Sequence, residues 1–94
     1  MLTLDHFAPL QGQQFELDAG DDGSVPVALV EANALTTYPG AVRAPFSLVF
    51  EGPAEPLLGQ ATYGLAHPAL GPLDIFLVPV ARSPAGIRYE AVFN

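Results

Sequence analysis

The 94 residues include ten acidic residues but only three Arg, with no Lys and no Cys, and the net charge is −7. This charge repels phosphate groups, so neither nucleic acid nor an anionic membrane is an expected partner. The lack of Cys excludes disulfides and thiolate zinc sites. Half of the residues are hydrophobic and six are Phe, which predicts one packed domain over residues 1–94.

The N-terminal segment predicts a short helix. Thr3 is a suitable N-cap residue, and the element would end near Leu10, before Gly12. Leu4 and Phe7 lie three positions apart, so one helix face would pack on a sheet and could close an open end of a barrel. No basic region precedes these residues, so we expect no secretory signal and a cytoplasmic protein.

Six later segments show the alternation of apolar and polar residues that is typical of half-buried strands. They cover residues 13–18, 25–37, 46–51, 60–67, 73–80 and 87–94. Pro26 indicates a strand start or an edge position, and the alternation falters near residues 31–33, which predicts a bulge. With short turn-rich connections and no long helix, the pattern predicts an all-β antiparallel fold, either a small barrel or a two-layer sandwich.

The last segment, "IRYEAVFN", has two interpretations. It could be a structural strand or a tail displayed for a partner. Its alternation matches that of "FSLVFE", with Tyr89, Ala91 and Phe93 on the inward side. Leaving Phe93 in water would forgo roughly 1.5–3 kcal/mol of burial. We therefore predict a strand.

A candidate interaction surface is formed by outward residues of the later strands. These residues are Val49, Phe76, Val78, Arg82 and Arg88. The three apolar residues are either a second core layer under the helix or a loop, or a surface for self-association or a protein partner. Arg88 and Glu90 share one strand face and could pair with a neighbouring strand, although exposed pairs contribute little to stability.

No set of residues with catalytic or metal-binding spacing is present. His6 and His67 lack the spacing of a metal site, and we expect His67 to bond the backbone of its turn. None of the three Ser residues lies in a Gly-x-Ser-x-Gly elbow. Asp21 and Asp22 lie in the acidic turn "DAGDDGS", where a solvated turn is favoured over calcium binding. We therefore expect a non-enzyme without a cofactor.

The blocks "FSLVFEGP", "YGLAHPALGPLDIFLVPV" and "YEAVFN", after an opening "LDHFAPLQGQQFEL", carry a family resemblance. They resemble a bacterial family of short stand-alone domains of unknown function, and the resemblance covers nearly the whole chain. It implies a stand-alone domain of about this length, an association with phage-tail-collar-like proteins, and hence an assembly or accessory role. It supplies no catalytic residue.

Two main hypotheses of function follow. The first is a non-enzymatic protein-interaction or assembly module that uses self-association or a protein partner, with strand addition at a sheet edge as its binding mode. The second is a small-ligand-binding domain or an enzyme with a pocket near Tyr63, His67 and Tyr89. Calcium binding at the acidic turn is a third alternative.

Overall fold

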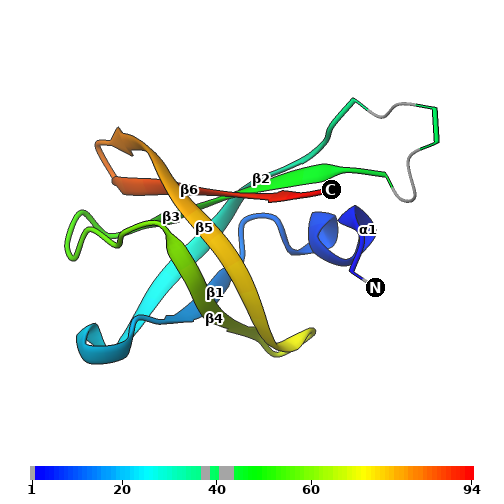
Figure 1. Ribbon diagram of the computed structural model, residues 1–94. Helices are drawn as coiled ribbons and strands as arrows, with labels where there is room; N and C mark the ends of the chain where they lie inside the picture. The colour runs from blue at the N-terminus through cyan, green and yellow to red at the C-terminus, as the bar shows by residue number, and fades with distance from the viewer. Residues whose placement is uncertain (1, 37–38, 41–43) are drawn as a thin grey trace.

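The computed structural model describes residues 2–36, 39–40 and 44–94. Within these residues, strands close into an antiparallel barrel with the order β1-β2-β3-β6-β5-β4, in which β4 pairs back to β1 (Figure 1). The strands are β1 (Gln14–Asp18), β2 (Ser24–Ala34), β3 (Phe46–Gly52), β4 (Ala61–His67), β5 (Gly71–Ser83) and β6 (Gly86–Phe93). The all-β prediction is confirmed, and the barrel replaces the sandwich alternative.

The predicted N-terminal helix is confirmed and plugs one end of the barrel. It consists of α1 (Leu4–Phe7) followed by a 3-10 turn, η1 (Ala8–Leu10). The backbone N–H of Thr3 donates to His6 Nδ1 at 2.9 Å, which secures the first turn. Phe7 is fully buried, and its ring centroid lies 5.9 Å from those of both Phe46 and Phe93. The short helix is thus held by tertiary packing rather than by its own length.

Strand β2 changes its neighbour along its length. Its first half pairs with β1, and pairing with β3 begins only at Ala28. Pro26 therefore lies where β2 has one paired neighbour, which confirms its predicted edge position. The register shifts between Leu29 and Glu31, close to the predicted bulge. The strand ends at Ala34, so the predicted extension to residue 36 is wrong, and residue 37 lies outside the described residues.

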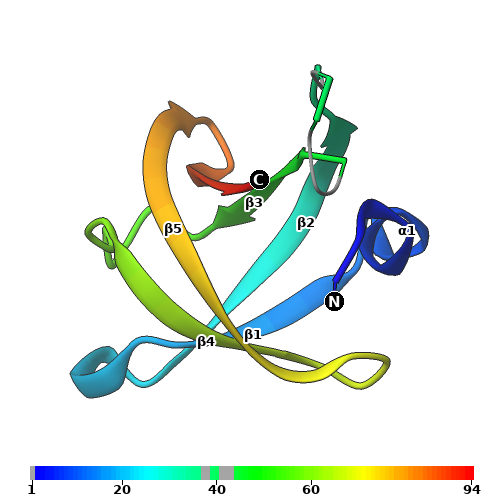
Figure 2. The ribbon, with the colours of Figure 1, turned by 45° about the vertical axis from the view of Figure 1, so that its right-hand side comes forward.

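Strand β5 is longer than predicted and also changes its neighbour. The sequence prediction ended this strand at residue 80, but β5 continues to Ser83 and pairs there with Gly86. Residues 71–77 pair with β4, and residues 78–83 pair with β6, with a register shift between Pro79 and Ala81. Pro79 lacks an N–H for the ladder, and a bulge is one of the places that tolerates it. This change of partner closes the barrel (Figure 2).

The barrel interior is filled by the inward side chains that the alternation predicts. The fully buried members include Phe15, Leu48, Phe50, Leu77 and Tyr89. The rings of Phe15 and Phe50 meet edge to face, with centroids 5.3 Å apart. Tyr63, Leu73 and the predicted inward residue Phe93 are only partly buried but pack against this core. Phe93 thus belongs to a structural strand.

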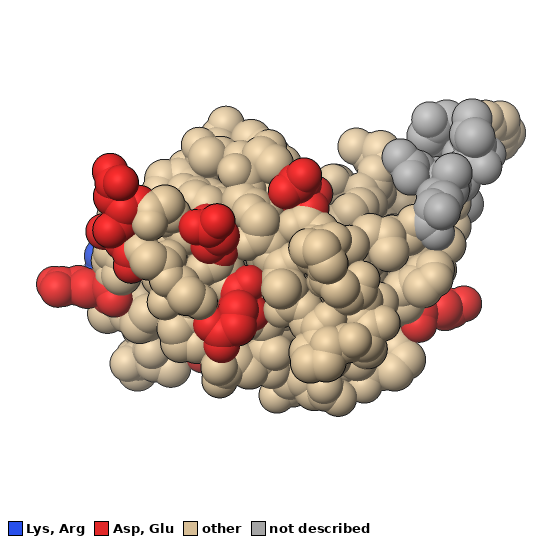
Figure 3. Space-filling model, turned by 90° about the horizontal axis from the view of Figure 1, so that it is seen from below, with Lys and Arg blue, Asp and Glu red and all other residues tan. Residues whose placement is uncertain are grey.

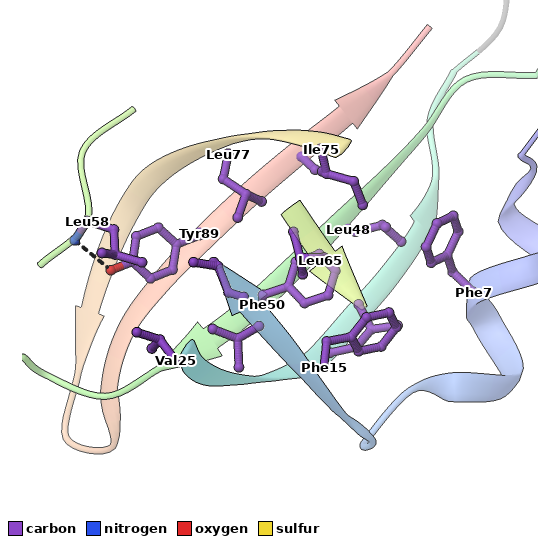
Figure 4. Packing of buried hydrophobic residues seen from close by; sticks show 14 of the residues in the cluster. Phe7, Phe15, Val25, Leu48, Phe50, Leu58, Leu65, Ile75, Leu77 and Tyr89 are labelled. Atoms are coloured by element: carbon purple, nitrogen blue, oxygen red, sulfur yellow. Dashed lines mark hydrogen bonds between the residues drawn. The ribbon is translucent and has the colours of Figure 1, made fainter. Parts of the chain in front are cut away.

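The two ends of the barrel are closed differently. Figure 4 shows Phe7 at one end of the core and Leu58 at the other. Leu58 lies in the connection between β3 and β4, and its backbone N–H donates to the buried hydroxyl oxygen of Tyr89 at 3.1 Å. The Leu58–Tyr89 contact therefore ties a loop to the core where the strands leave an opening. None of the helices in the described part of the chain has the length and hydropathy needed to cross a bilayer.

Candidate functional site

Exposed apolar side chains gather on the outer side of β5 and β6. We define the β5–β6 outer surface as Phe76, Val78, Val80 and Val92. Phe76 is 51% exposed, while Val80 and Val92 are each 52% exposed. Val78 is partly buried. The alternation along β5 and along β6 turns these side chains away from the core.

The register of the sheet places Val49 beside this surface but leaves it covered. Val49 pairs with Glu90 on β6, and Glu90 pairs with Val78 on β5. Val49 faces away from the core cluster, yet it is only 9% exposed. Its prediction as part of an open contact surface therefore needs correction, because almost none of the side chain is available to a partner. Glu31 on β2 flanks it on the other side.

Arg88 is engaged across three strands. Its Nε–H donates to Glu51 Oε2 at 3.0 Å, and its Nη1 lies 3.5 Å from Glu31 Oε2. The hydroxyl of Ser83 also donates to Glu51 Oε2, at 2.9 Å. Both contacts hold the pKa of Glu51 below its ordinary value. The hydrogen bond from Ser83 has the larger effect, and the hydrogen bond from Arg88 has the smaller one. Arg88 therefore links β6 to β2 and β3, whereas Arg82 is exposed at the hairpin.

Two carboxylates border the β5–β6 outer surface. Asp74 precedes Phe76 by two residues on the same side of β5 and is exposed. Glu90 lies opposite Val78 and two residues before Val92. Among the described residues, neither carboxylate forms an ion pair. Seen from below, the molecule as a whole shows dispersed Asp and Glu side chains, with Lys or Arg visible only at the left margin (Figure 3).

The proposed cluster of Tyr63, His67 and Tyr89 is not assembled as one pocket. The Tyr63 hydroxyl donates to the backbone carbonyl of Gly59 at 2.6 Å. The Tyr89 hydroxyl accepts from the backbone N–H of Leu58, which precedes Gly59 in the same loop. His67 lies four residues beyond Tyr63 on β4, or about 13 Å along the strand. The two Tyr residues thus anchor one loop, at a distance from His67.

His67 has a structural role in the described fold. It is buried, and its Nδ1 accepts from the backbone N–H of Ala69 at 3.0 Å, which confirms the predicted bond to its turn. Its Nε2 lies 2.8 Å from Gln13 Oε1. The neutral tautomer with the proton on Nε2 satisfies both contacts. His67 therefore joins the β4–β5 turn to the start of β1.

Surface hollows in the described part of the chain are formed by other residues. One, of about 370 Å³, lies between the N-terminal segment and the ends of β2 and β3, and it is lined by Leu2, Thr3, Leu4, Asp5, Ala34, Ala44 and Pro45. Another, of about 300 Å³, is lined by Gln14, Pro26, Val27, Ala28, Glu51, Gly52, Pro53 and Ala85. Neither hollow includes Tyr63, His67 or Tyr89, nor any residue of the β5–β6 outer surface.

The acidic turn forms a 3-10 turn, η2 (Gly20–Asp22), between β1 and β2. Asp21 and Asp22 are exposed there, and Asp18 Oδ1 accepts from the backbone N–H of Gly20 at 3.0 Å. Within the described ranges, no three His, Asp or Glu residues gather in a metal-binding arrangement. The acidic turn thus contains exposed carboxylates, but among the described residues they are not arranged as a metal site.

Sequence reasoning missed two members of the β5–β6 outer surface. Val92 was detectable, because the alternation that turns Ala91 and Phe93 inward turns Val92 outward. Val80 was detectable in the same way, because it follows Phe76 and Val78 at two-residue intervals along β5. The register shift between Pro79 and Ala81 lies beside Val80.

These features define a small closed antiparallel barrel with a filled interior and an apolar outer surface on β5 and β6. The chain belongs to the family described as a domain of unknown function, DUF6916, which matches residues 2–93. The expected resemblance to a family of unknown function is confirmed at this level. No curated protein and no solved structure matches the chain.

Proposed function

We propose that the chain is a non-enzymatic protein-interaction or assembly module that contacts its partner through the β5–β6 outer surface. The observation that carries the proposal is the exposure of three large apolar side chains, Phe76, Val80 and Val92, on neighbouring strands. Gathered apolar surface of this kind marks interaction sites more often than isolated apolar residues do. Either a protein partner or a second copy would gain from covering it.

The hydrogen bonds of Tyr63, His67 and Tyr89 also support an interaction module over a small-ligand site, because all three side chains bind other parts of the fold. The hydroxyls of Tyr63 and Tyr89 bind the loop at Leu58 and Gly59, and His67 binds its own turn and Gln13. Each of these groups already has a partner within the fold, so none of them is held ready for a ligand alone. The proposal accordingly assigns neither catalysis nor a cofactor to this chain.

The biological setting is part of the proposal. A bacterial origin and an accessory role in a phage-tail-like assembly are supported by the resemblance of the "HPALG", "FLVPV" and "YEAVFN" blocks, and a cytoplasmic location is part of the same proposal. The net charge of −7 supports a protein partner over nucleic acid or an anionic membrane.

Affinity capture from the native host, followed by mass spectrometry, tests the proposal. Wild-type protein is compared with Phe76→Asp, which places a charge in the surface, and with Leu57→Asp as a matched control. Leu57 is 59% exposed in the connection between β3 and β4, outside the surface. The captured partner should be lost with Phe76→Asp and kept with Leu57→Asp, while circular dichroism shows that both variants fold.

Concentration-dependent mass measurement covers the alternative of self-association. A wild-type oligomer that Phe76→Asp dissociates would identify a second copy as the partner and would still support an interaction module. The proposal is contradicted if wild-type protein is a monomer at every concentration and captures the same proteins as Phe76→Asp.

A further inference from the structure

We infer that the β5–β6 outer surface binds an extended segment of a partner protein in which apolar side chains alternate with or adjoin Lys or Arg. This inference rests on the proposed function and specifies the chemistry of the partner. Three features carry it: apolar side chains on either side of the point where β5 and β6 separate, a β6 edge that pairs with no strand there among the described residues, and two carboxylates that form no ion pair with a described residue. Each feature lies on described residues of β5 or β6.

Strands β5 and β6 separate next to the most exposed apolar residues. Their pairing begins at Val78 and Glu90, and residues 71–77 of β5 pair with β4 instead. If the Val78–Glu90 register continued for two residues, Phe76 and Val92 would be opposite each other, and they therefore lie on the two sides of the separation. Figure 2 shows β5 turning away while β6 runs toward the C-terminus. An apolar side chain from a partner could therefore contact Phe76 and Val92 together.

The separation leaves one side of β6 open. Residues 91–93 pair with β3 through the register Phe46–Phe93, Ser47–Val92 and Leu48–Ala91, but they have no pairing with β5. An extended segment can add to such an edge through main-chain hydrogen bonds, and its alternate side chains then fall on one face of the sheet. This geometry favours an extended segment over a helix that lies across the surface.

The charge at the surface selects the partner's chemistry. Asp74 and Glu90 each lie two residues, or about 7 Å, along a strand from an exposed apolar residue. Within the described residues neither has an ion pair, because Arg88 is occupied by Glu31 and Glu51. A Lys or Arg next to the docking apolar residue would meet an uncompensated carboxylate.

The same charge disfavours a second copy of this chain. Each copy carries a net charge of −7, so an interface between two copies would bring these carboxylates toward another acidic surface. Like charges placed across an interface reduce affinity and suppress the contact. Arg82, an exposed cation at the hairpin, lies six residues beyond Phe76 on β5 and so is remote from the separation.

A random peptide library displayed on phage tests the inference with purified full-length protein as the target. Selection on the wild-type protein, with counter-selection on Phe76→Asp, should enrich sequences that combine apolar residues with Lys or Arg. A synthetic peptide of the enriched sequence should then perturb the amide NMR signals of Val92 and its neighbours on β6. Its affinity should fall as the salt concentration rises.

Charge variants then separate the inference from the proposed function. The double variant Asp74→Asn/Glu90→Gln should weaken the selected peptide by about two- to tenfold. The matched control, Asp21→Asn/Asp22→Asn, removes two carboxylates from the acidic turn and should leave the affinity unchanged. Equal affinity for all three proteins would overturn the inference.

Other outcomes have distinct meanings. Enrichment of uncharged or acidic apolar peptides that still require Phe76 would overturn the basic partner while keeping the interaction surface. Peptides that bind wild-type protein and Phe76→Asp equally, or no enriched peptide at all, would overturn the inference. A wild-type dimer that Phe76→Asp dissociates would assign the surface to a second copy, against the inference but in keeping with the proposed function.

Discussion

Phe50 and Phe76 are the same side chain in two opposite environments. Phe50 on β3 is fully buried and meets Phe15 edge to face, whereas Phe76 on β5 is half exposed on the outer side of the barrel. Burial removes the Phe50 ring from water and so stabilises the fold, while the exposed part of Phe76 contributes nothing of that kind. The comparison shows that the core of this small barrel is filled without the outer apolar residues. The outer residues are therefore available for binding.

Replacing each of the two rings gives the largest expected difference. Phe50→Ala should lower the free energy of unfolding by about 3–5 kcal/mol, because it removes buried contacts and leaves a cavity. Phe76→Ala should lower it by about 1 kcal/mol at most. Denaturant unfolding measures both, with Phe50→Leu as a milder variant if Phe50→Ala does not fold. Equal losses for the two Ala variants would remove the distinction between the environments.

The hairpin that joins β5 to β6 depends on close backbone contact. Gly86 has a φ of +152°, and a Cβ built there would overlap the carbonyl oxygen of Gly52. Gly86→Ala should therefore cost at least about 1–3 kcal/mol of stability through backbone strain and displacement of the hairpin. Gly59→Ala is the control, since a Cβ at Gly59 meets nothing within 4 Å. A Gly86→Ala protein as stable as the control would show that the hairpin position is not constrained by this contact.

Two Tyr hydroxyls bind adjacent residues of one loop but differ in burial. Tyr89→Phe would leave the buried N–H of Leu58 without its acceptor, so we expect a loss of about 1–3 kcal/mol. Tyr63→Phe frees the exposed carbonyl of Gly59, which water can reach, and should cost less than about 1 kcal/mol. Thermal unfolding of the two variants provides the comparison. The reverse order of stability would contradict the role assigned to the Tyr89 hydroxyl in closing the barrel end.

The smallest expected effect concerns the pH dependence of stability on the outer side of the sheet. The folded-state pKa of Glu51 lies below its ordinary value, so its contribution is full above the ordinary carboxyl pKa of about 4.3. That contribution is lost as the pH falls through the lowered folded-state pKa. Ser83→Ala removes the larger cause of the shift and should flatten the acid side of the stability profile.

Arg82→Met is the control for this profile. Arg82 is exposed and makes no ion pair with Glu51, so its removal should leave the acid-side slope unchanged. Unfolding measured by urea across the acid range tests both variants. If Ser83→Ala follows the wild-type slope, the Ser83–Glu51 bond does not set the pKa of Glu51.

Alternation along the chain was enough to predict the strands, the interior and two of the four apolar residues of the β5–β6 outer surface. The inward and outward sides of "FSLVFE", "LDIFLVPV" and "IRYEAVFN" follow from the two-residue period of a strand, which depends only on local backbone geometry. The same local reasoning predicted the short helix and the turn bond of His67. These features need no knowledge of which strands become neighbours.

Which strands pair, and in which register, only the tertiary structure decided. The closure into a barrel, the change of partner within β5, the covering of Val49 and the engagement of Arg88 by Glu31 and Glu51 all bring together residues far apart in the sequence. The distance between His67 and the two Tyr residues, Tyr63 and Tyr89, was likewise decided by the tertiary structure. Such contacts depend on the simultaneous packing of all six described strands around one core, and a one-residue change of register would alter every one of them.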